Sequence, residues 1–412
     1  MAFAMPVPNT APTQFTGTLT RNEVFGSIYN MIISQEVFAS PIKGTYSTLA
    51  DKFRKEGSEY GDSKLFYSVQ IGDVEDWRGD AEAADLLDLN RPEDPACQVV
   101  KLDTFKLIWL TVDRFLSKRA WGNEGIFSQF TSVVLATMRD AKRVYEAKMV
   151  NAFVGSTSTA IGRQTQTVTL ATGTTEADHR LRAQQIGRKI ADILVDIKDP
   201  GSNYNDYQYE RSYDEGDLMF VWNADFYNEI TKLDLPTIFH NDGIVERLGE
   251  NVLPARYFGD TITTTNLASY SAASPAPGKP INSSTGAYTP GAGNANGTIR
   301  SLYEMDLKVG GTTTHVRPGD EIPSGFILKA DTIVGDGTVA SLKGLNLFYI
   351  ENKKAICKIM HKDAIQYMSG FNSETEFINS RAKTETHYLI FGYSSLPQAR
   401  LKEYPYITLL EA

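Results

Sequence analysis

The strongest constraint on the fold is a run of three elements between residues 64 and 155. Lys64–Ile71 alternates in the manner of a strand, and a second strand pattern extends from Cys97 to Phe115. Asn123–Gly155 then reads as a single helix of about nine turns with apolar residues at spacings of three and four. Globular helices average about 11–12 residues, so this arrangement suits an extended subunit that reaches its neighbours better than a compact enzyme.

The predicted helix has start and stop signals and two distinct faces. Asn123 is an expected N-cap and Gly155 an expected C′ residue. The apolar face is predicted to contain Phe127, Phe130, Val134, Met138, Ala141, Tyr145, Met149 and Ala152. The opposite face is predicted to carry Arg139, Lys142, Arg143 and Glu146.

An acidic segment, residues 73–94, separates the two strands and carries −7 of the chain's net charge of −9. Its carboxylates do not have the spacing of an EF-hand loop, and a solvated flap is the simplest interpretation. The alternative is pairing with a basic patch on a neighbouring subunit, which would set register more than affinity. The candidate contact residues are Asp73, Glu75, Asp76, Trp77, Asp80 and Glu82, opposite Arg114, Lys118, Arg119, Arg139, Lys142 and Arg143.

Outside this region the chain alternates between arm, helix and strand patterns. Residues 1–22 contain three prolines and no periodicity, which indicates an extended arm, and Arg21–Ala39 favours a short helix. A second amphipathic helix is predicted at Glu176–Ile197, where Thr175 and Asp178 nearly form a capping box. The wholly apolar Leu218–Trp222 predicts a buried strand that leads into a helix over 224–233.

Two further stretches differ in composition. Of the 38 residues in 261–298, 32 are Gly, Ala, Ser, Thr, Asn or Pro, which predicts a long surface loop or insertion outside the core. Thr157–Thr175 is Thr-rich and predicts a hairpin or loop. Residues 302–350 and 356–407 read as short strands with turns.

Composition and motifs exclude several functions. A net charge of −9 and a pI near 5.2 disfavour a general nucleic-acid binder. The two cysteines exclude a disulfide framework. The chain lacks a Walker loop, a dinucleotide fingerprint, a zincin helix and a hydrolase elbow. The five histidines form no i, i+4 pair, so we predict no catalytic residue, no cofactor and no metal. We also expect no membrane span.

The order of elements resembles the major capsid protein of tailed bacteriophages, the Hong Kong phage-type fold. The resemblance implies an α+β fold with an N-terminal arm, an extended β-hairpin loop, a long spine helix in a peripheral domain and an α/β axial domain. The implied boundaries are 1–40 for the arm and short helix, 41–122 for the connector and extended loop, 123–175 for the spine helix and start of the peripheral domain, 176–345 for the axial domain with its insertion at 261–298, and 346–412 for the return to the peripheral domain. The chain length and the low-charge, Thr-, Ser- and Gly-rich composition are similar to those of capsid proteins from short-tailed phages.

The resemblance implies a structural protein that self-assembles, as pentamers and hexamers, into an icosahedral shell enclosing the viral genome. It further implies a virion protein assembled in the host cytoplasm, a separate scaffolding protein and portal, and DNA held without sequence-specific binding. An encapsulin-like nanocompartment shell is the alternative within this architecture. A carboxylate-based hydrolase is a more distant alternative, because it needs two carboxylates about 5–10 Å apart in a cleft.

Overall fold

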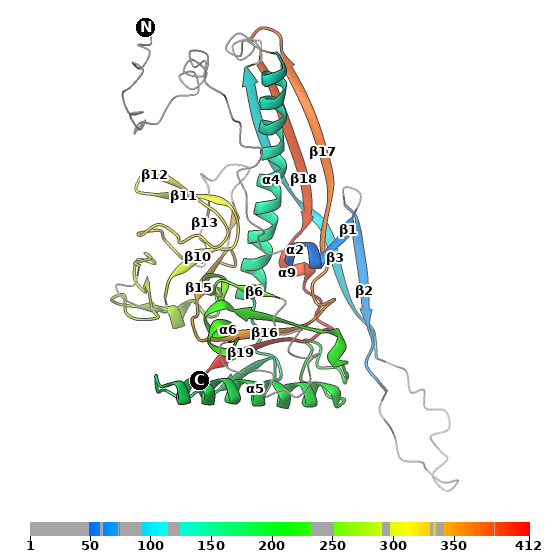
Figure 1. The fold of residues 1–412 in the computed structure, drawn as a ribbon, viewed down its shortest axis with the longest axis vertical. Coiled ribbons are helices and arrows are strands. Elements are labelled where there is room, and N and C mark those ends of the chain that lie inside the picture. Colours follow the sequence, from blue (N-terminus) through cyan, green and yellow to red (C-terminus); the bar gives the residue numbers. More distant parts are fainter. Residues whose placement is uncertain are drawn as a thin grey trace, which may run out of the picture. The chain divides into compact units, whose positions relative to one another are not determined.

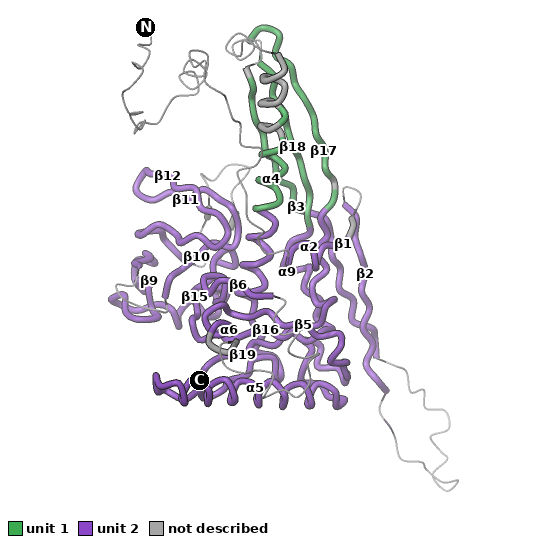
Figure 2. The backbone as a smooth tube through the Cα atoms, in the orientation of Figure 1, with its two compact units in different colours: residues 1–46, 104–144, 370–393 green, residues 47–103, 145–369, 394–412 purple. Residues whose placement is uncertain are grey.

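The structure is a computed structural model that describes residues 49–57, 61–72, 74, 93–113, 124–231, 251–290, 297–329, 333–334, 342–343, 345–382 and 384–412. The predicted arm, the short helix at 21–39 and nearly all of the acidic segment 73–94 lie outside these residues. The chain divides into two compact units, coloured in Figure 2. Unit 1 comprises residues 1–46, 104–144 and 370–393, and unit 2 the remainder.

The described residues of unit 1 form one helix against a group of long strands. Its helical part belongs to α4 (Glu124–Ser156), and its strands belong to β3 (Ala96–Asp113), β17 (Tyr367–Asn379) and β18 (Thr384–Ser394). Figure 1 shows α4 running alongside β17 and β18. Met138 of α4 and Leu389 and Phe391 of β18 are buried here, and Met138 and Leu389 line the same cavity. The predicted long helix and long second strand are therefore confirmed.

The five-stranded sheet that lies wholly within unit 2, called the larger sheet below, has the order β4-β19-β16-β5-β6. Its strands are Thr165–Val168, Tyr406–Glu411, Ala355–His361, Leu218–Asn223 and Val252–Leu253. β16 is antiparallel to both β19 and β5, whereas β4 and β6 pair in parallel at the two ends. The apolar run in β5 is buried at every position, as its sequence predicts for a strand covered on both faces.

Helix α5 (Glu176–Lys198) covers one face of this sheet, with α6 (Ala224–Thr231) beside it. The capping box at Thr175 and Asp178 is present, so the predicted helix start is confirmed. The predicted stripe is also confirmed: Ile186, Ile190, Ile193 and Ile197 are buried in the same cluster as Trp222. Figure 1 shows α5 lying across the sheet beneath β16 and β19.

A second core in unit 2 corrects the prediction for residues 261–298. Ile262, Ile281 and Tyr288 are at most 1% exposed and pack in one cluster with Phe348. In the described part of this stretch, small residues form turns at 264–266 and 283–285, and the large apolar side chains lie in the core or pack against it. The Tyr288 hydroxyl donates to Glu321 at 2.8 Å. The stretch is thus part of a folded body, because burial depends on a handful of side chains rather than on average composition.

Short elements build this second body. Its sheet has the order β10-β15-β7. Two 3₁₀ turns accompany it, at Ala255–Tyr257 and Leu267–Tyr270. A further 3₁₀ turn, Glu215–Asp217, precedes β5 of the larger sheet. The strands are β7 Gly259–Thr261, β8 Ser271–Ala272, β9 Ile281–Asn282, β10 Ile299–Ser301, β11 Met305–Val309, β12 Thr312–Val316, β13 Ile333–Val334, β14 Leu342–Lys343 and β15 Phe348–Glu351. Unit 2 also contains α2 Leu49–Phe53, β1 Arg54–Gly57, β2 Ser63–Ser68 and α9 Leu396–Ala399.

Three local predictions were wrong, and for Gly155 and Glu146 a tertiary contact decided the outcome. Gly155 is not a C′ residue: it lies inside α4, where an added Cβ would stand 2.1 Å from the carbonyl oxygen of Tyr257. Glu146 is 1% exposed instead of facing solvent, since Arg54 and Ser369 bind its carboxylate at 2.7 and 2.6 Å. Ala141, expected to be buried, is exposed.

The Thr-rich stretch after α4 is neither a hairpin nor wholly a loop. It contains β4, which pairs in parallel with the C-terminal strand β19 and so closes one end of the larger sheet. The pairing partner lies some 240 residues away in the chain, from Thr165 to Thr408. Local alternation could not reveal such a partner.

Candidate functional site: an exposed apolar strand and two side-chain clusters

Strand β2 carries an apolar face that is open to solvent. Leu65, Tyr67, Val69 and Ile71 are 50–64% exposed, while the even-numbered residues between them are covered to a greater degree. Because side chains alternate across a strand, Leu65 and Tyr67 lie on one face of β2, and Val69 and Ile71 follow in the chain just beyond its end at Ser68. Soluble proteins seldom leave a run of large apolar side chains in water without an interaction partner.

β2 is also a terminal strand. It follows β3 at the end of the order β1-β17-β18-β3-β2, and among the described residues no strand pairs with its other edge. It is antiparallel to the start of β3, with Tyr67 opposite Cys97 and Leu65 opposite Val99. An edge of unpaired N–H and C=O groups is a template for strand addition by another chain. The edge and the apolar face together form what we call the β2 surface.

Polar contacts fix the base of this two-stranded ribbon in unit 2. The Gln98 amide donates to the carbonyl oxygens of Gln398 and Arg400 at 3.1 and 2.6 Å, and its oxygen accepts from the Lys402 N–H at 2.9 Å. Arg211 donates to the carbonyl oxygen of Val69 at 2.6 Å and also pairs with Glu403. The ribbon is therefore presented in a defined position relative to the body of unit 2.

Nine of the twelve predicted contact residues lie outside the described part of the chain: Asp73, Glu75, Asp76, Trp77, Asp80, Glu82, Arg114, Lys118 and Arg119. The structure describes Arg139, Lys142 and Arg143, all on α4. Arg139 forms a two-pronged pair with Glu374, with Nε–Oε1 and Nη2–Oε2 distances of 3.0 Å. Lys142 donates to Asn372 at 2.5 Å and lies 5.2 Å from the ring centre of Phe391. Contacts of these residues with another subunit stay a prediction.

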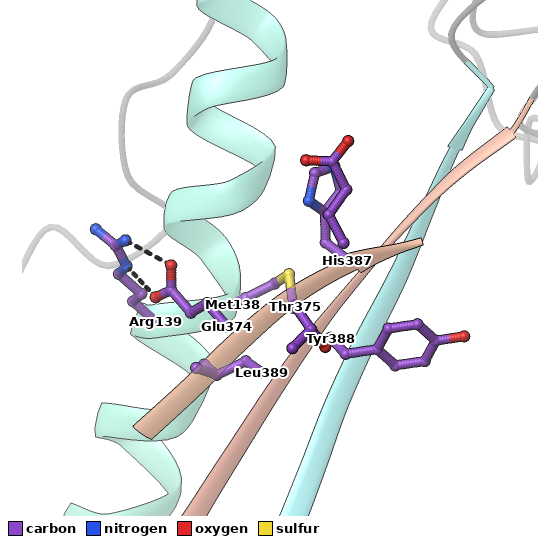
Figure 3. Close-up of a pocket in the computed structure, with 8 residues that line it drawn as sticks. Met138, Arg139, Glu374, Thr375, His387, Tyr388 and Leu389 are labelled. Atoms are coloured by element: carbon purple, nitrogen blue, oxygen red, sulfur yellow. Dashed lines mark hydrogen bonds and ion pairs between the residues drawn. The ribbon is translucent and has the colours of Figure 1, made fainter. Parts of the chain in front are cut away.

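A cavity of about 340 Å³ lies beside the Arg139–Glu374 pair in unit 1. Figure 3 shows Met138 and Arg139 on α4, with His387 and Leu389 on the strands opposite. Bonding to Arg139 lowers the pKa of Glu374 and keeps its carboxylate ionised. Glu376 and His387 line the same cavity, and with Glu385 they place three metal-ligating atoms within 4.8 Å of one another.

The sequence search missed this cluster because it tested helical spacing. Glu385 and His387 are two residues apart, which places both on one face of a strand, and both belong to β18. Glu376 comes from β17. A search for i, i+2 pairs of ligating residues in predicted strands would have found Glu385 and His387, but only the hairpin adds Glu376.

A fully buried lysine lies in the centre of the larger sheet of unit 2. Lys358 of β16 donates to the carbonyl oxygen of Thr157 at 2.5 Å and to the hydroxyl of Thr408 at 2.9 Å. Burial lowers the pKa of Lys358 to about 8. Both contacts join segments far apart in the chain, so we assign this cation a structural role.

A broad groove beside α5 holds several carboxylates, as the hydrolase alternative would require. It is lined by Asp192, Asp196 and Asp199 together with Arg163 and Tyr204. Tyr204 and Arg163 both bind Asp196, and these bonds lower its pKa. A general acid needs a raised pKa, so Asp196 is unsuited to protonating a leaving group.

The structure combines long strands, the long helix α4 and a strand, β2, whose outer edge no described strand pairs with. These features are typical of a subunit that associates with other subunits. A family model of the Phi29-like phage major capsid protein matches residues 3–395. The chain belongs to this family, and it is a structural protein that forms the capsid shell of a phage. The expected function as a structural shell protein is thereby confirmed, whereas the division into peripheral and axial domains stays a prediction.

Solved structures agree on the fold. The chain is similar to one in the capsid structure of Staphylococcus phage Andhra, with 14% identity, 93% of this chain and 88% of that chain covered, and a TM-score of 0.57. It is also similar to a chain in the structure of the head fiber and inner core protein of native bacteriophage P68, with 11% identity, 100% and 94% coverage, and a TM-score of 0.56. No curated protein matches the chain. In the described residues, no helix combines the length and apolarity needed to cross a bilayer.

Proposed function

We propose that the subunits join into pentamers and hexamers of an icosahedral shell through the β2 surface, each copy adding this strand and its apolar face to a neighbouring copy. The observation that carries the proposal is the pair of exposed apolar side chains Leu65 and Tyr67 on an edge strand, followed by exposed Val69 and Ile71 just beyond its end. Strand addition supplies main-chain hydrogen bonds, and the alternate side chains supply specificity.

The energetic argument favours a contact at this surface. Burying apolar area contributes roughly 25 cal/mol per Å², so each large side chain that becomes covered favours association by about 1–2 kcal/mol. The ribbon is already ordered at its base by Gln98 and Arg211. Less conformational entropy is then lost on assembly than for a free segment.

Further partners belong to the same proposal. The acidic segment 73–94 continues from β2 and would meet basic residues of a neighbour, among them Arg114, Lys118 and Arg119. A separate scaffolding protein, a portal and DNA packaged without sequence-specific contacts complete the assembly, which takes place in the host cytoplasm. The protein acts without catalytic turnover. Packaged DNA, rather than a cargo protein, would distinguish the virion from an encapsulin-like compartment.

The two native cysteines provide a direct test. Cys97 is exposed and lies opposite Tyr67, whereas Cys357 is fully buried. Burial also raises the pKa of Cys357, which leaves its thiol unreactive. We expect a maleimide to label one thiol per chain in free subunits and none in closed shells. Equal labelling of Cys97 in shells and free subunits would show that the β2 surface is not a contact.

A substitution tests the same surface by electron microscopy. Tyr67→Asp places a charge in the apolar face, and we expect folded subunits that fail to form closed shells. Val195→Asp is the matched control, since Val195 is 70% exposed and lies on α5, outside β2 and β3. Normal shells from the Tyr67 variant would exclude this surface as a required contact.

A further inference from the structure

We infer that Glu376, Glu385 and His387 form a binding site for a divalent transition-metal ion, of which Zn²⁺ is the representative, in the β17–β18 hairpin. The three ligand atoms lie within 4.8 Å of one another. The Nε2 atom of His387 is 3.1 Å from Oε1 of Glu385, the separation expected of two neighbouring ligands that each lie about 2.0–2.2 Å from one ion.

The imidazole is the group that most strongly indicates a ligand. Nε2 of His387 is shielded from solvent, and among the described residues it has no hydrogen-bond partner, because its approach to Glu385 lacks hydrogen-bond geometry. A buried nitrogen without a hydrogen-bond partner is energetically unfavourable. A metal ion would bind directly to the lone pair of this Nε2 atom. His387 and Glu385 are each only 14% exposed, so the site is partly desolvated.

The charges also favour a cation. With a neutral imidazole, the two carboxylates give the cluster a charge of about −2, and a divalent ion balances it. Arg139, the nearby guanidinium on the wall of the cavity, is already engaged by both oxygens of Glu374. The cation at the cavity wall is therefore committed to a different carboxylate.

The cavity provides the remaining coordination positions. Glu376 and His387 line a space of about 340 Å³, ample for water molecules of about 30 Å³ each. Glu376 is exposed and can swing inward to close the site. An imidazole with two carboxylates suits Zn²⁺ or Mn²⁺ better than Mg²⁺ or Ca²⁺, which prefer oxygen ligands throughout. The bound ion would tie β17 to β18 and stabilise unit 1.

A second histidine offers a matched control. His315, in unit 2, also lies between two carboxylates, with Nδ1 2.7 Å from Asp306 and Nε2 2.8 Å from Glu304. Its carboxylates bind opposite edges of the ring, so they cannot converge with it on one ion. The surroundings of His315 therefore contain the same kinds of residue but not the geometry of a metal site.

The test is a calorimetric titration of ZnCl₂ into the full-length chain after dialysis against a chelator, with Co²⁺ absorption as a spectroscopic probe of coordination. We expect one ion per chain and a rise of several degrees in Tm at saturating Zn²⁺. His387→Gln and Glu385→Gln should weaken binding at least tenfold, whereas His315→Gln should leave it unchanged.

Circular dichroism of the chelated proteins checks that each variant is folded. If His387→Gln does not fold, Glu376→Gln replaces it, because that side chain is exposed. The inference is overturned if Zn²⁺ binds without a one-to-one step or binds equally well to the variants of the cluster. The titration uses unassembled subunits, so its result is independent of whether the β2 surface forms the shell contact.

Discussion

Strands β16 and β2 show two opposite uses of a strand in one chain. β16 lies in the middle of its sheet, and all but its last residue are buried, including a lysine. β2 lies at the end of its strand order and turns its large apolar side chains outward. Hydrophobicity alone does not separate them, since both strands contain large apolar residues. The difference is whether the chain itself supplies the second layer, which it does for β16 and which we propose a neighbouring copy does for β2.

The largest expected contrast is between two aromatic residues. Trp222 on β5 is 2% exposed in the core of unit 2, and Tyr67 on β2 is 64% exposed. We expect Trp222→Ala to lower the free energy of unfolding by about 3–5 kcal/mol, from lost burial and the cavity left behind. Tyr67→Ala should change it by less than about 0.5 kcal/mol. Urea unfolding of free subunits, followed by circular dichroism, measures both. Similar losses would erase the distinction between β2 and the strands that the chain itself covers.

The second prediction concerns the buried charge of β16. The folded-state pKa of Lys358 is about 8, below the unfolded value of about 10.4. Between these values the unfolded chain binds more protons, so the contribution of Lys358 to stability rises with pH, by on the order of 3 kcal/mol across the full window. Lys358→Met should abolish this rise.

Free energies of unfolding at pH 7.5 and about 9.5 check the pH effect, because this range lies below the ionisation of most tyrosines. Lys101→Met, at an exposed position of β3, is the control and should retain the wild-type slope. If the Lys358 variant keeps the slope as well, the lysine is not the titrating group.

The third prediction tests how firmly the ribbon is held. Gln98→Ala removes its hydrogen bonds to Gln398, Arg400 and Lys402, each worth about 1 kcal/mol or less. We expect a loss of about 1–2 kcal/mol and faster hydrogen exchange along β2 and the start of β3. Gln166→Ala, which loses one exposed bond to Arg163, should do neither. Unchanged exchange along β2 would mean that Gln98 does not position the ribbon.

The smallest effect is expected in a hairpin with a polar outer face. In β11–β12 the hydrogen bond that the ring of His315 donates to Asp306 raises the pKa of His315, with Glu304 assisting. Stability from this raised pKa is present below the unfolded pKa and is lost as pH rises through the folded one. Because His315 is half exposed, His315→Gln should change stability by less than about 0.5 kcal/mol. Nuclear magnetic resonance of the ring checks the direction: Asp306→Asn should lower the pKa of His315.

Local sequence determined several elements of the fold. The capping box at Thr175 and the isoleucine stripe of α5 define that helix from one end to the other. The unbroken apolar run of β5 specifies a buried strand, and alternation defines β2 and β3. These features depend on neighbours within a few residues. The identity of the fold was accessible for the same reason, because the order of such elements along the chain is a property of the sequence.

Only the tertiary structure decided which side chains meet across long separations. The sequence predicts a surface position for Glu146, whereas in the structure Arg54 and Ser369 bind its buried carboxylate. Glycine is required at position 155 because the carbonyl oxygen of Tyr257, some hundred residues away, lies too close for a side chain. Residues 261–298 contribute to a core because Ile262, Ile281 and Tyr288 pack in one cluster with Phe348. The cluster of Glu376, Glu385 and His387 exists only once β17 and β18 pair. The physical reason is common to all four: burial, close approach and ligand geometry are set by distances in space, which periodicity along the chain does not encode.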